Sequence, residues 1–224
     1  MTGSTSPGGN RPPSGRLLYR GAEAEVILGE WQGLDAVYKI RNPLPYRLPA
    51  LDGAIRRQRT LREAEMIHQA KAAGVAAPYL YAVDVPSSTL VMEYVRGVRV
   101  KDLIGDSSKR ETARVFHEFG RDAARLHAAG IMHGDLTTAN VVKRDGRLVF
   151  IDFGLSVRTH RLEDHAVDLR LIKETLGGAH PAVASAAMRA LEGGYEVVAG
   201  AARSRAVLRQ LRSIERRGRY ARVA

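Results

Sequence analysis

The fold of this chain is decided by one stretch, His133-Gly134-Asp135-Leu136-Thr137-Thr138-Ala139-Asn140, with Ile151-Asp152-Phe153-Gly154 shortly after it. Asp135 lies five positions before Asn140, and Asp152 lies twelve positions after it. At this spacing one carboxylate can accept the proton of an attacking hydroxyl, while an amide oxygen and a second carboxylate hold Mg²⁺ on nucleotide phosphates. The stretch therefore predicts a phosphoryl-transfer centre, with Asp135 as the catalytic base and Asn140 and Asp152 as metal ligands.

The segment between the two loops supports this interpretation. Arg147–Ile151 is short and mostly apolar, which is typical of a buried strand. A hairpin at this point would bring the two loops together. The alternative is a pair of ordinary turns that each contain an aspartate, because the Asp-Phe-Gly tripeptide alone is a weak signal.

Composition limits the class of protein. The chain has 224 residues, 45% of them hydrophobic, which suits one large domain or two small lobes. No apolar run approaches the roughly eighteen residues of a membrane helix, and the N-terminus lacks a secretory pattern, so we expect a cytoplasmic protein with no membrane partner. The absence of cysteine excludes disulfides and thiolate metal sites. The net charge of +11 favours polyanionic partners.

Four regions are expected along the chain. Residues 1–14 are rich in Gly, Ser, Thr and Pro and are predicted to form a disordered leader, because they cannot bury enough apolar surface to offset the entropy of ordering. Residues 15–95 are predicted to form an N-terminal lobe and residues 96–200 a C-terminal lobe. Residues 201–224 are predicted to form a basic helix and tail.

The N-terminal lobe is expected to begin with three strands, Leu17–Tyr19, Glu25–Leu28 and Leu34–Ile40. Between the first two lies a turn of small residues that could bring backbone N–H groups near phosphate, Gly21-Ala22-Glu23-Ala24. Lys39 resembles the strand lysine that contacts the α- and β-phosphates in kinases. The alternative for Lys39 is an ordinary charge on a strand edge.

Prolines within residues 42–49 exclude a helix there, and a helical pattern runs from Ala54 until Gly74 ends it. Its apolar or small positions are Ile55, Leu61, Ala64, Ile67 and Ala70. Glu63 is the predicted ion-pair partner of Lys39, with Glu65 as the second choice. Alternatively, both glutamates are solvated partners of nearby arginines, which contribute little to stability.

A further strand pair is predicted at Tyr79–Val85 and Ser88–Tyr94. The second strand leads through Met92, Glu93, Tyr94 and Val95, the position at which kinases hydrogen-bond the adenine ring through backbone groups. Any buried strand would show the same apolar run, so only its position supports this role.

The C-terminal lobe is expected to be mostly helical. A helix over Glu111–Ala129 should bury one face that carries Val115, Phe116, Phe119, Ala123, Leu126 and His127. Another helix should open at Ala166–Leu169, with Asp168 bracing the catalytic loop from beneath. A third is expected over Ala182–Leu191, with Gly193-Gly194 as a break.

The last segment is strongly basic. Residues 201–224 contain eight arginines against one acid, Glu215, and an apolar stripe formed by Val207, Leu208, Leu211 and Ile214. This pattern predicts a docked helix with an arginine face outward. Arginine binds phosphate bidentately, so RNA contact is predicted, against the alternative of a solvated basic face. The residues expected to contact RNA are Arg212, Arg216, Arg217, Arg219 and Arg222.

The order of these motifs resembles the protein-kinase superfamily. Over about residues 17–220 the chain most resembles the small atypical kinase subunit of the KEOPS (EKC) complex of archaea and eukaryotes, the PRPK-type, RIO-like kinases. The segments that carry this resemblance are Gly21–Ala24, Tyr46–Asp52, Arg59–Ala64, His133–Asn140, Glu163–Leu169 and Arg216–Arg219. The Asp-Leu-Thr-Thr-x-Asn form and the Tyr-Arg-x-Pro-x-Leu-Asp insert are far more specific than Asp-Phe-Gly alone.

The resemblance implies an α+β fold: a minimal two-lobed kinase-like fold with an antiparallel sheet and one helix in the N-lobe, and a mostly helical C-lobe. It implies ATP and Mg²⁺ as cofactors and phosphotransferase activity, either Ser/Thr phosphorylation or ATP hydrolysis. The implied role is support of threonylcarbamoyladenosine modification of tRNA. The implied partners are a threonylcarbamoyl transferase subunit, a small regulatory subunit and tRNA.

Three departures from ordinary protein kinases point away from general protein phosphorylation. Gly134 replaces an arginine that reads activation-loop phosphate, and Thr137 replaces a lysine near the γ-phosphate, which predicts slow peptide phosphorylation. The distance from Asp152 to Asp168 leaves no room for a long activation segment.

Three alternatives stay open. One is a small-molecule kinase of the aminoglycoside or choline type, which would need a larger helical substrate domain after the catalytic loop. Another is a RIO-type kinase, which usually carries an extra N-terminal helical domain. The third is a non-catalytic kinase-fold scaffold. A scaffold would have no need for all four of the residues Lys39, Asp135, Asn140 and Asp152.

Overall fold

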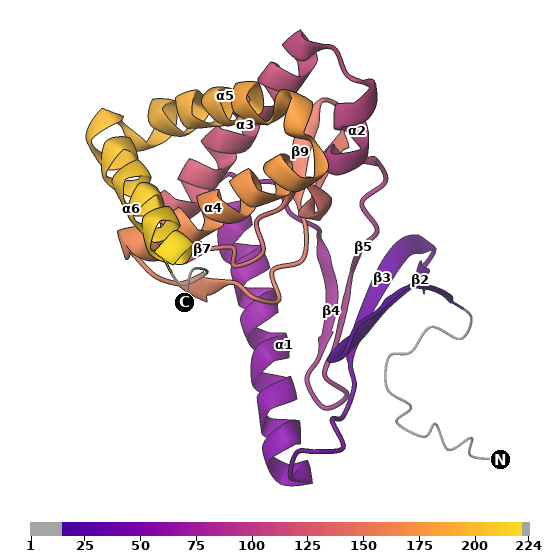
Figure 1. Cartoon of the computed structure of the whole chain (residues 1–224). Coiled ribbons are helices and arrows are strands. Elements are labelled where there is room, and N and C mark those ends of the chain that lie inside the picture. The colour runs from indigo at the N-terminus through magenta and orange to yellow at the C-terminus, as the bar shows by residue number, and fades with distance from the viewer. Residues whose placement is uncertain (1–14, 221–224) are drawn as a thin grey trace, which may run out of the picture. The chain divides into compact units, whose positions relative to one another are not determined.

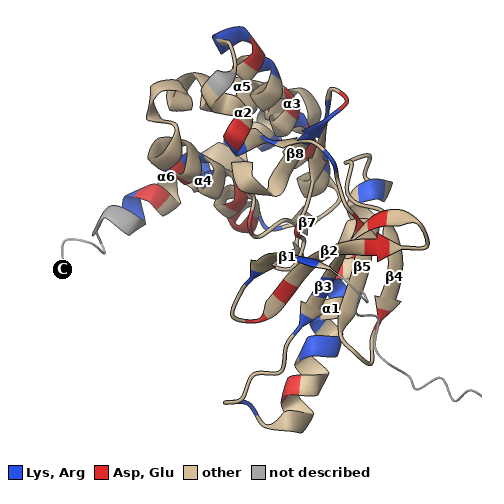
Figure 2. Cartoon of the chain, turned by 90° about the vertical axis from the view of Figure 1, so that its right-hand side faces the viewer, with Lys and Arg blue, Asp and Glu red and all other residues tan. Residues whose placement is uncertain are grey.

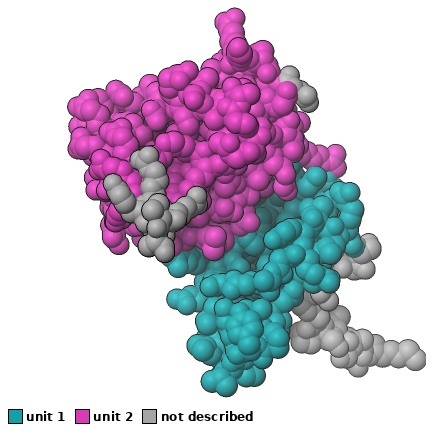
Figure 3. Space-filling model, in the orientation of Figure 1, with its two compact units in different colours: residues 1–65, 78–95 teal, residues 66–77, 96–224 magenta. Residues whose placement is uncertain are grey.

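The computed structural model describes residues 15–220, so the predicted leader over residues 1–14 and the position of Arg222 lie outside the described residues (Figure 1). The chain divides into two compact units (Figure 3). Unit 1 holds residues up to Glu65 together with Pro78–Val95, and unit 2 holds Met66–Ala77 together with the chain from Arg96 onward. Residues 66–77, which we expected in the N-terminal lobe, therefore belong to unit 2.

Unit 1 is built on a five-stranded antiparallel sheet with the strand order β1-β2-β3-β5-β4. Its strands are β1 (Arg16–Arg20), β2 (Ala24–Trp31), β3 (Leu34–Arg41), β4 (Leu80–Asp84) and β5 (Thr89–Glu93). All five predicted strands are present; β5 is buried over Thr89–Met92, whereas every residue of β1 is exposed. The buried centre of this sheet consists of Ala36, Tyr38 and Val91.

The helix of unit 1 begins earlier than predicted. Helix α1 spans Pro49–Ala72 and starts five residues before Ala54. A proline is tolerated at the first helical position, because its missing N–H would have no partner within the helix. The predicted apolar stripe is also wrong at Leu61, which is 50% exposed, whereas the polar residues Asp52, Thr60 and Glu63 are buried.

Unit 2 is mostly helical. Its helices are α2 (Val100–Asp106), α3 (Lys109–Ala128), the 3₁₀ turn η1 (Thr138–Asn140), α4 (Leu162–Ala179), α5 (Pro181–Ala199) and α6 (Ala201–Tyr220). One sheet has the order β6-β8-β9, with β6 (Val98–Arg99), β8 (Val141–Arg144) and β9 (Arg147–Phe150). A second sheet pairs β7 (Ile131–Met132) with β10 (Val157–Arg158). Helix α4 begins at Leu162, earlier than the predicted opening at Ala166.

Helices α3 and α5 pack closely through two glycines. The predicted buried face of α3 is confirmed. The predicted break at Gly193-Gly194 is wrong, since α5 continues through both residues. A side chain at Gly194 would collide with the carbonyl oxygen of His117, and one at Gly120 would collide with the carbonyl oxygen of Leu191. These glycines allow close backbone approach between the two helices.

Helix α6 is docked as predicted through Val207, Leu211 and Ile214, which are buried. Arg203 does not belong to the predicted outward arginine face, because it is only partly exposed and its Nη2 atom donates to the His127 carbonyl oxygen at 3.3 Å. Basic residues occur in both units and not on α6 alone (Figure 2). Over residues 15–220, the structure contains no helix with the length and apolar character needed to cross a membrane.

Candidate active site

Unit 1 contains a buried ion-pair cluster centred on Glu63. Lys39 Nζ donates to Glu63 Oε1 at 2.7 Å, and Arg41 Nη2 donates to Glu63 Oε2 at 2.5 Å. Glu63 is 1% exposed. The structure therefore pairs Lys39 with Glu63, while the second choice, Glu65, is exposed. The contact of Lys39 with phosphate stays a prediction.

Sequence reasoning missed Arg41. Arg41 lies two residues after Lys39 on β3, and side chains of a strand alternate between its faces, so both cations lie on the same face. That alternation was the available signal. Arg41 occupies the second oxygen of Glu63, so this one buried carboxylate contacts both cations.

The predicted phosphate loop, Gly21–Ala24, is a tight turn. The Gly21 N–H donates to the Ala24 carbonyl oxygen at 2.9 Å, so this N–H is already satisfied within the turn. The Glu23 carboxylate accepts hydrogen bonds from Arg47 at 3.3 Å and from Arg59. Gly21, Ala22, Glu23 and Ala24 remain predicted nucleotide contacts.

The predicted adenine segment closes β5. The Glu93 N–H donates to the Tyr79 carbonyl oxygen at 2.8 Å, and the Tyr94 N–H donates to the Asp35 carbonyl oxygen at 3.2 Å. An adenine ring at this segment would therefore have to use other backbone groups, such as the N–H of Val95. The adenine contact of Met92–Val95 stays a prediction, and these two bonds leave fewer backbone groups in the segment for it.

In unit 2, Asn140 is fixed against the predicted base. Its Nδ2 atom donates to Asp135 Oδ2 at 2.7 Å and to the Asp135 carbonyl oxygen at 3.0 Å. With the amide nitrogen held in this way, the Oδ1 atom of Asn140 is the group that is left to bind a cation. Oδ1 of Asp135 accepts no hydrogen bond from any residue within 15–220, so a substrate hydroxyl can use it.

The β8–β9 hairpin brings Asp152 to the same end of the sheet as Asn140. Val141 pairs with Phe150, and the Ile151 N–H donates to the Asn140 carbonyl oxygen at 2.9 Å. Asp152 has a φ of +61°, an uncommon conformation for a residue with a side chain, and its Oδ1 accepts the Gly154 N–H at 3.2 Å. Such local strain is found at functional turns. The predicted hairpin between the two loops is confirmed.

These side chains suit Mg²⁺, which prefers carboxylate and amide oxygens and takes its remaining ligands from phosphates and water. Within residues 15–220 no cluster of three or more His, Cys, Asp or Glu could hold a metal by itself. Binding of Mg²⁺ by Asn140 and Asp152 stays a prediction.

Asp168 supports the predicted catalytic loop, His133–Asn140, as expected. Its carboxylate accepts the His133 N–H at 2.7 Å and the Gly134 N–H at 2.9 Å. Gly134 has a φ of +83°, and a side chain there would collide with the carbonyl oxygen of Leu155. An arginine therefore cannot occupy this position in the observed backbone. Burial lowers the pKa of His133, so its ring is neutral.

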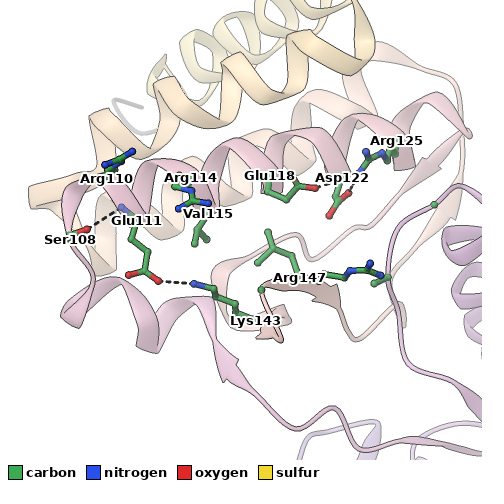
Figure 4. Close-up of a pocket in the computed structure, with 14 residues that line it drawn as sticks. Ser108, Arg110, Glu111, Arg114, Val115, Glu118, Asp122, Arg125, Lys143 and Arg147 are labelled. Carbon is green, nitrogen blue, oxygen red and sulfur yellow. Dashed lines mark hydrogen bonds and ion pairs between the residues drawn. The ribbon is translucent and has the colours of Figure 1, made fainter.

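Unit 2 also has a hollow of about 770 Å³ beside α3, which contains none of the predicted site residues (Figure 4). Its charged groups are largely paired: Lys143 donates to Glu111 at 2.6 Å, and Arg125 lies beside Glu118 and Asp122 (Figure 4). Burial raises the pKa of Asp122 to about 6. This hollow is a mixed-charge surface.

The predicted RNA contacts lie at the end of α6. Arg212 and Arg216 are exposed, and Arg217 donates to Glu163 of α4 at 2.7 Å. The side chain of Arg219 and the whole of Arg222 lie outside the described part of the chain. RNA contact by this group stays a prediction.

Comparison with known proteins identifies the relatives of this chain. The RIO domain family matches residues 53–173. The KEOPS complex subunit Bud32 of Pyrococcus abyssi is 37% identical over 211 residues, which cover 92% of this chain and 96% of that protein. The EKC/KEOPS complex subunit bud32 of Dictyostelium discoideum is 32% identical, with 92% of this chain and 83% of that protein covered.

A probable bifunctional tRNA threonylcarbamoyladenosine biosynthesis protein of Methanothermobacter thermautotrophicus is 40% identical. The match covers 93% of this chain but only 37% of that longer protein. Among solved structures, the Rio2 kinase–ADP/Mg²⁺–phosphoaspartate complex from Chaetomium thermophilum aligns with a TM-score of 0.62 at 16% identity, covering 92% of this chain and 70% of that one. At this identity the likeness shows the fold alone, and it confirms the predicted kinase-like α+β fold.

Proposed function

The chain belongs to the RIO-domain family and, within it, to the Bud32-type subunits of KEOPS complexes, and we propose that it is an ATP- and Mg²⁺-dependent atypical Ser/Thr kinase or ATPase that supports threonylcarbamoyladenosine modification of tRNA. The observation that carries this proposal is the fixed pair of Asp135 and Asn140. A scaffold that only binds partners has no need to hold a base and an amide in this arrangement.

Each polar group has a place in the proposed chemistry. Oδ1 of Asp135 accepts the proton of the attacking hydroxyl or water. Oδ1 of Asn140 and the carboxylate of Asp152 would hold Mg²⁺, and the bound ion would neutralise charge on the phosphates. Lys39, oriented by Glu63, contacts the α- and β-phosphates.

ATP hydrolysis or phosphorylation of few targets fits the structure better than general protein phosphorylation. Only the short strand β10 and its flanking turns separate Asp152 from α4, so a long peptide-docking segment has no place. Gly134 also cannot carry the arginine that reads activation-loop phosphate, because Leu155 occupies that space.

The proposed partners are a threonylcarbamoyl transferase subunit, a small regulatory subunit and tRNA. Two relatives are named as KEOPS subunits, and a third is a longer protein named as bifunctional in tRNA threonylcarbamoyladenosine biosynthesis. A role in tRNA modification also fits the cytoplasmic location expected from the sequence.

The test is ATP turnover by the purified chain, alone and with a transferase subunit and tRNA, in the presence and absence of Mg²⁺. We expect Mg²⁺-dependent phosphate release that the transferase subunit and tRNA change. Absence of turnover under all these conditions would favour the non-catalytic scaffold.

A further inference from the structure

A buried polar network lies behind the catalytic loop, and the proposed chemistry uses none of its outer members. It joins four helices: His127 of α3, His165 and Asp168 of α4, Tyr195 of α5 and Arg203 of α6. The two histidines and Asp168 are fully buried, and Tyr195 is 1% exposed. The two imidazole rings stack in parallel, with centroids 4.3 Å apart and an interplanar angle of 6°.

The hydrogen bonds of His127 have a defined direction. Its Nε2 atom lies 3.1 Å from Asp168 Oδ2, and a carboxylate accepts, so Nε2 carries the proton. On the other side, the Tyr195 hydroxyl lies 2.9 Å from Nδ1. Burial raises the pKa of Tyr195, and a phenol that stays protonated can donate to Nδ1. His127 is therefore held from both sides.

The hydrogen bonds of His165 assign it the same tautomer as His127, with the proton on Nε2. Its Nε2 atom lies 3.1 Å from the Thr159 carbonyl oxygen, which can only accept, so Nε2 again carries the proton. His165 Nδ1 then accepts a hydrogen bond from Arg203 Nη2 at 3.2 Å. Arg203 Nη2 also donates to the His127 carbonyl oxygen at 3.3 Å. Burial and the neighbouring His127 lower the pKa of His165 to about 4, which keeps the ring neutral.

These contacts connect α6 to the loop that carries the predicted base. Arg203 orients His165, and His165 stacks on His127. His127 donates to the same Asp168 oxygen that accepts the His133 N–H, while the other oxygen of Asp168 accepts the Gly134 N–H. Gly134 immediately precedes the base, Asp135.

We propose that Arg203 is a positioning residue that makes helix α6 part of the support of the catalytic loop, acting through His165, His127 and Asp168. It does not touch the reacting groups. The effect on turnover rests on the proposed function, whereas the effect on the loop does not.

The test compares Arg203→Met with Arg205→Met in the full chain. Arg205 lies on the same helix and is exposed, so its replacement removes the same charge without entering the network. Hydrogen exchange of the Gly134 amide is measured by NMR without nucleotide, together with the free energy of unfolding in urea. We expect at least about tenfold faster exchange at Gly134 in Arg203→Met and wild-type exchange in Arg205→Met, since a lost supporting bond opens the loop locally.

Unchanged exchange at Gly134 would overturn the proposal. So would an equal acceleration at amides throughout unit 2, which would make Arg203 merely structural. If Arg203→Met does not fold, Arg203→Gln makes a smaller change at the same position, and Gly134 exchange in that variant decides the question in the same way.

Turnover gives a second measurement. We expect Arg203→Met to lower kcat for ATP about tenfold with an unchanged KM, because a displaced base affects the transition state more than nucleotide binding. Arg203→Lys, which keeps a donor, should recover part of the loss. If the wild-type chain shows no turnover, the proposed function fails while the exchange result still decides the role of Arg203.

Discussion

Replacing Glu63 with glutamine tests the ion-pair cluster of unit 1. Glutamine keeps the size and an accepting oxygen but removes the negative charge that balances Lys39 and Arg41. Water cannot compensate, because Glu63 is 1% exposed and the two cations are 9% and 7% exposed. Removing one partner of a buried ion pair costs about 3–5 kcal/mol, so we expect Glu63→Gln to lower the free energy of unfolding by about 3 kcal/mol.

The assay is urea unfolding of the full chain, with Glu65→Gln as the matched control on the same helix. Glu65 is exposed, so its replacement should change stability by less than about 0.5 kcal/mol. The double variant Glu63→Gln/Arg41→Met should lose at least about 1 kcal/mol less free energy of unfolding than the sum of the two single losses. The second change removes a cation that the first change left without its carboxylate. Equal losses for the two glutamines, or additive losses for Glu63 and Arg41, would refute the reasoning.

Three further outcomes are expected. Lys39→Met should lower ATP turnover at least about a hundredfold without unfolding the chain, as phosphate-release assays and circular dichroism can show; intact activity would make Lys39 an edge charge. The pKa of Asp122 is raised to about 6, so the stability that its protonated carboxyl contributes is present at low pH and is lost as the pH rises through 6. In urea unfolding, the free energy of unfolding of Asp122→Asn should therefore exceed that of the wild type by up to about 3 kcal/mol at pH 8 and by little at pH 4. Replacing Arg212 and Arg216 with glutamine should weaken tRNA binding and flatten the dependence of tRNA affinity on salt concentration. An unchanged salt dependence would show that these arginines form a solvated basic face without RNA contact.

The sequence was sufficient where a periodic pattern matched the burial. The buried face of α3 follows a period of 3.6 residues and was predicted from it, and the five strands of unit 1 were predicted from short apolar runs between turns. The spacing of the Asp-Leu-Thr-Thr-x-Asn stretch also singled out Asp135 and Asn140, which the structure joins by a hydrogen bond, while their roles as base and metal ligand stay predictions. These features depend on local order along the chain, which a sequence displays directly.

The sequence misled where distant segments decide the outcome. Gly194 suggests a break when α5 is considered alone, yet it is needed where α5 meets the carbonyl oxygen of His117 on α3. Leu61 fits an apolar stripe, but the buried face of α1 in unit 1 is polar because Glu63 meets Lys39 and Arg41 there. The inward direction of Arg203 likewise depends on two histidines far away in the sequence.

The most direct test of the central claim is Mg²⁺-dependent phosphate release from ATP by Asp135→Ala, measured beside the wild type. Loss of a positioned base costs two or more decades of rate, so we expect turnover to fall at least about a hundredfold while nucleotide affinity and the free energy of unfolding stay close to wild type. Near-normal turnover in a folded Asp135→Ala protein would contradict the assignment of this stretch as a phosphoryl-transfer centre.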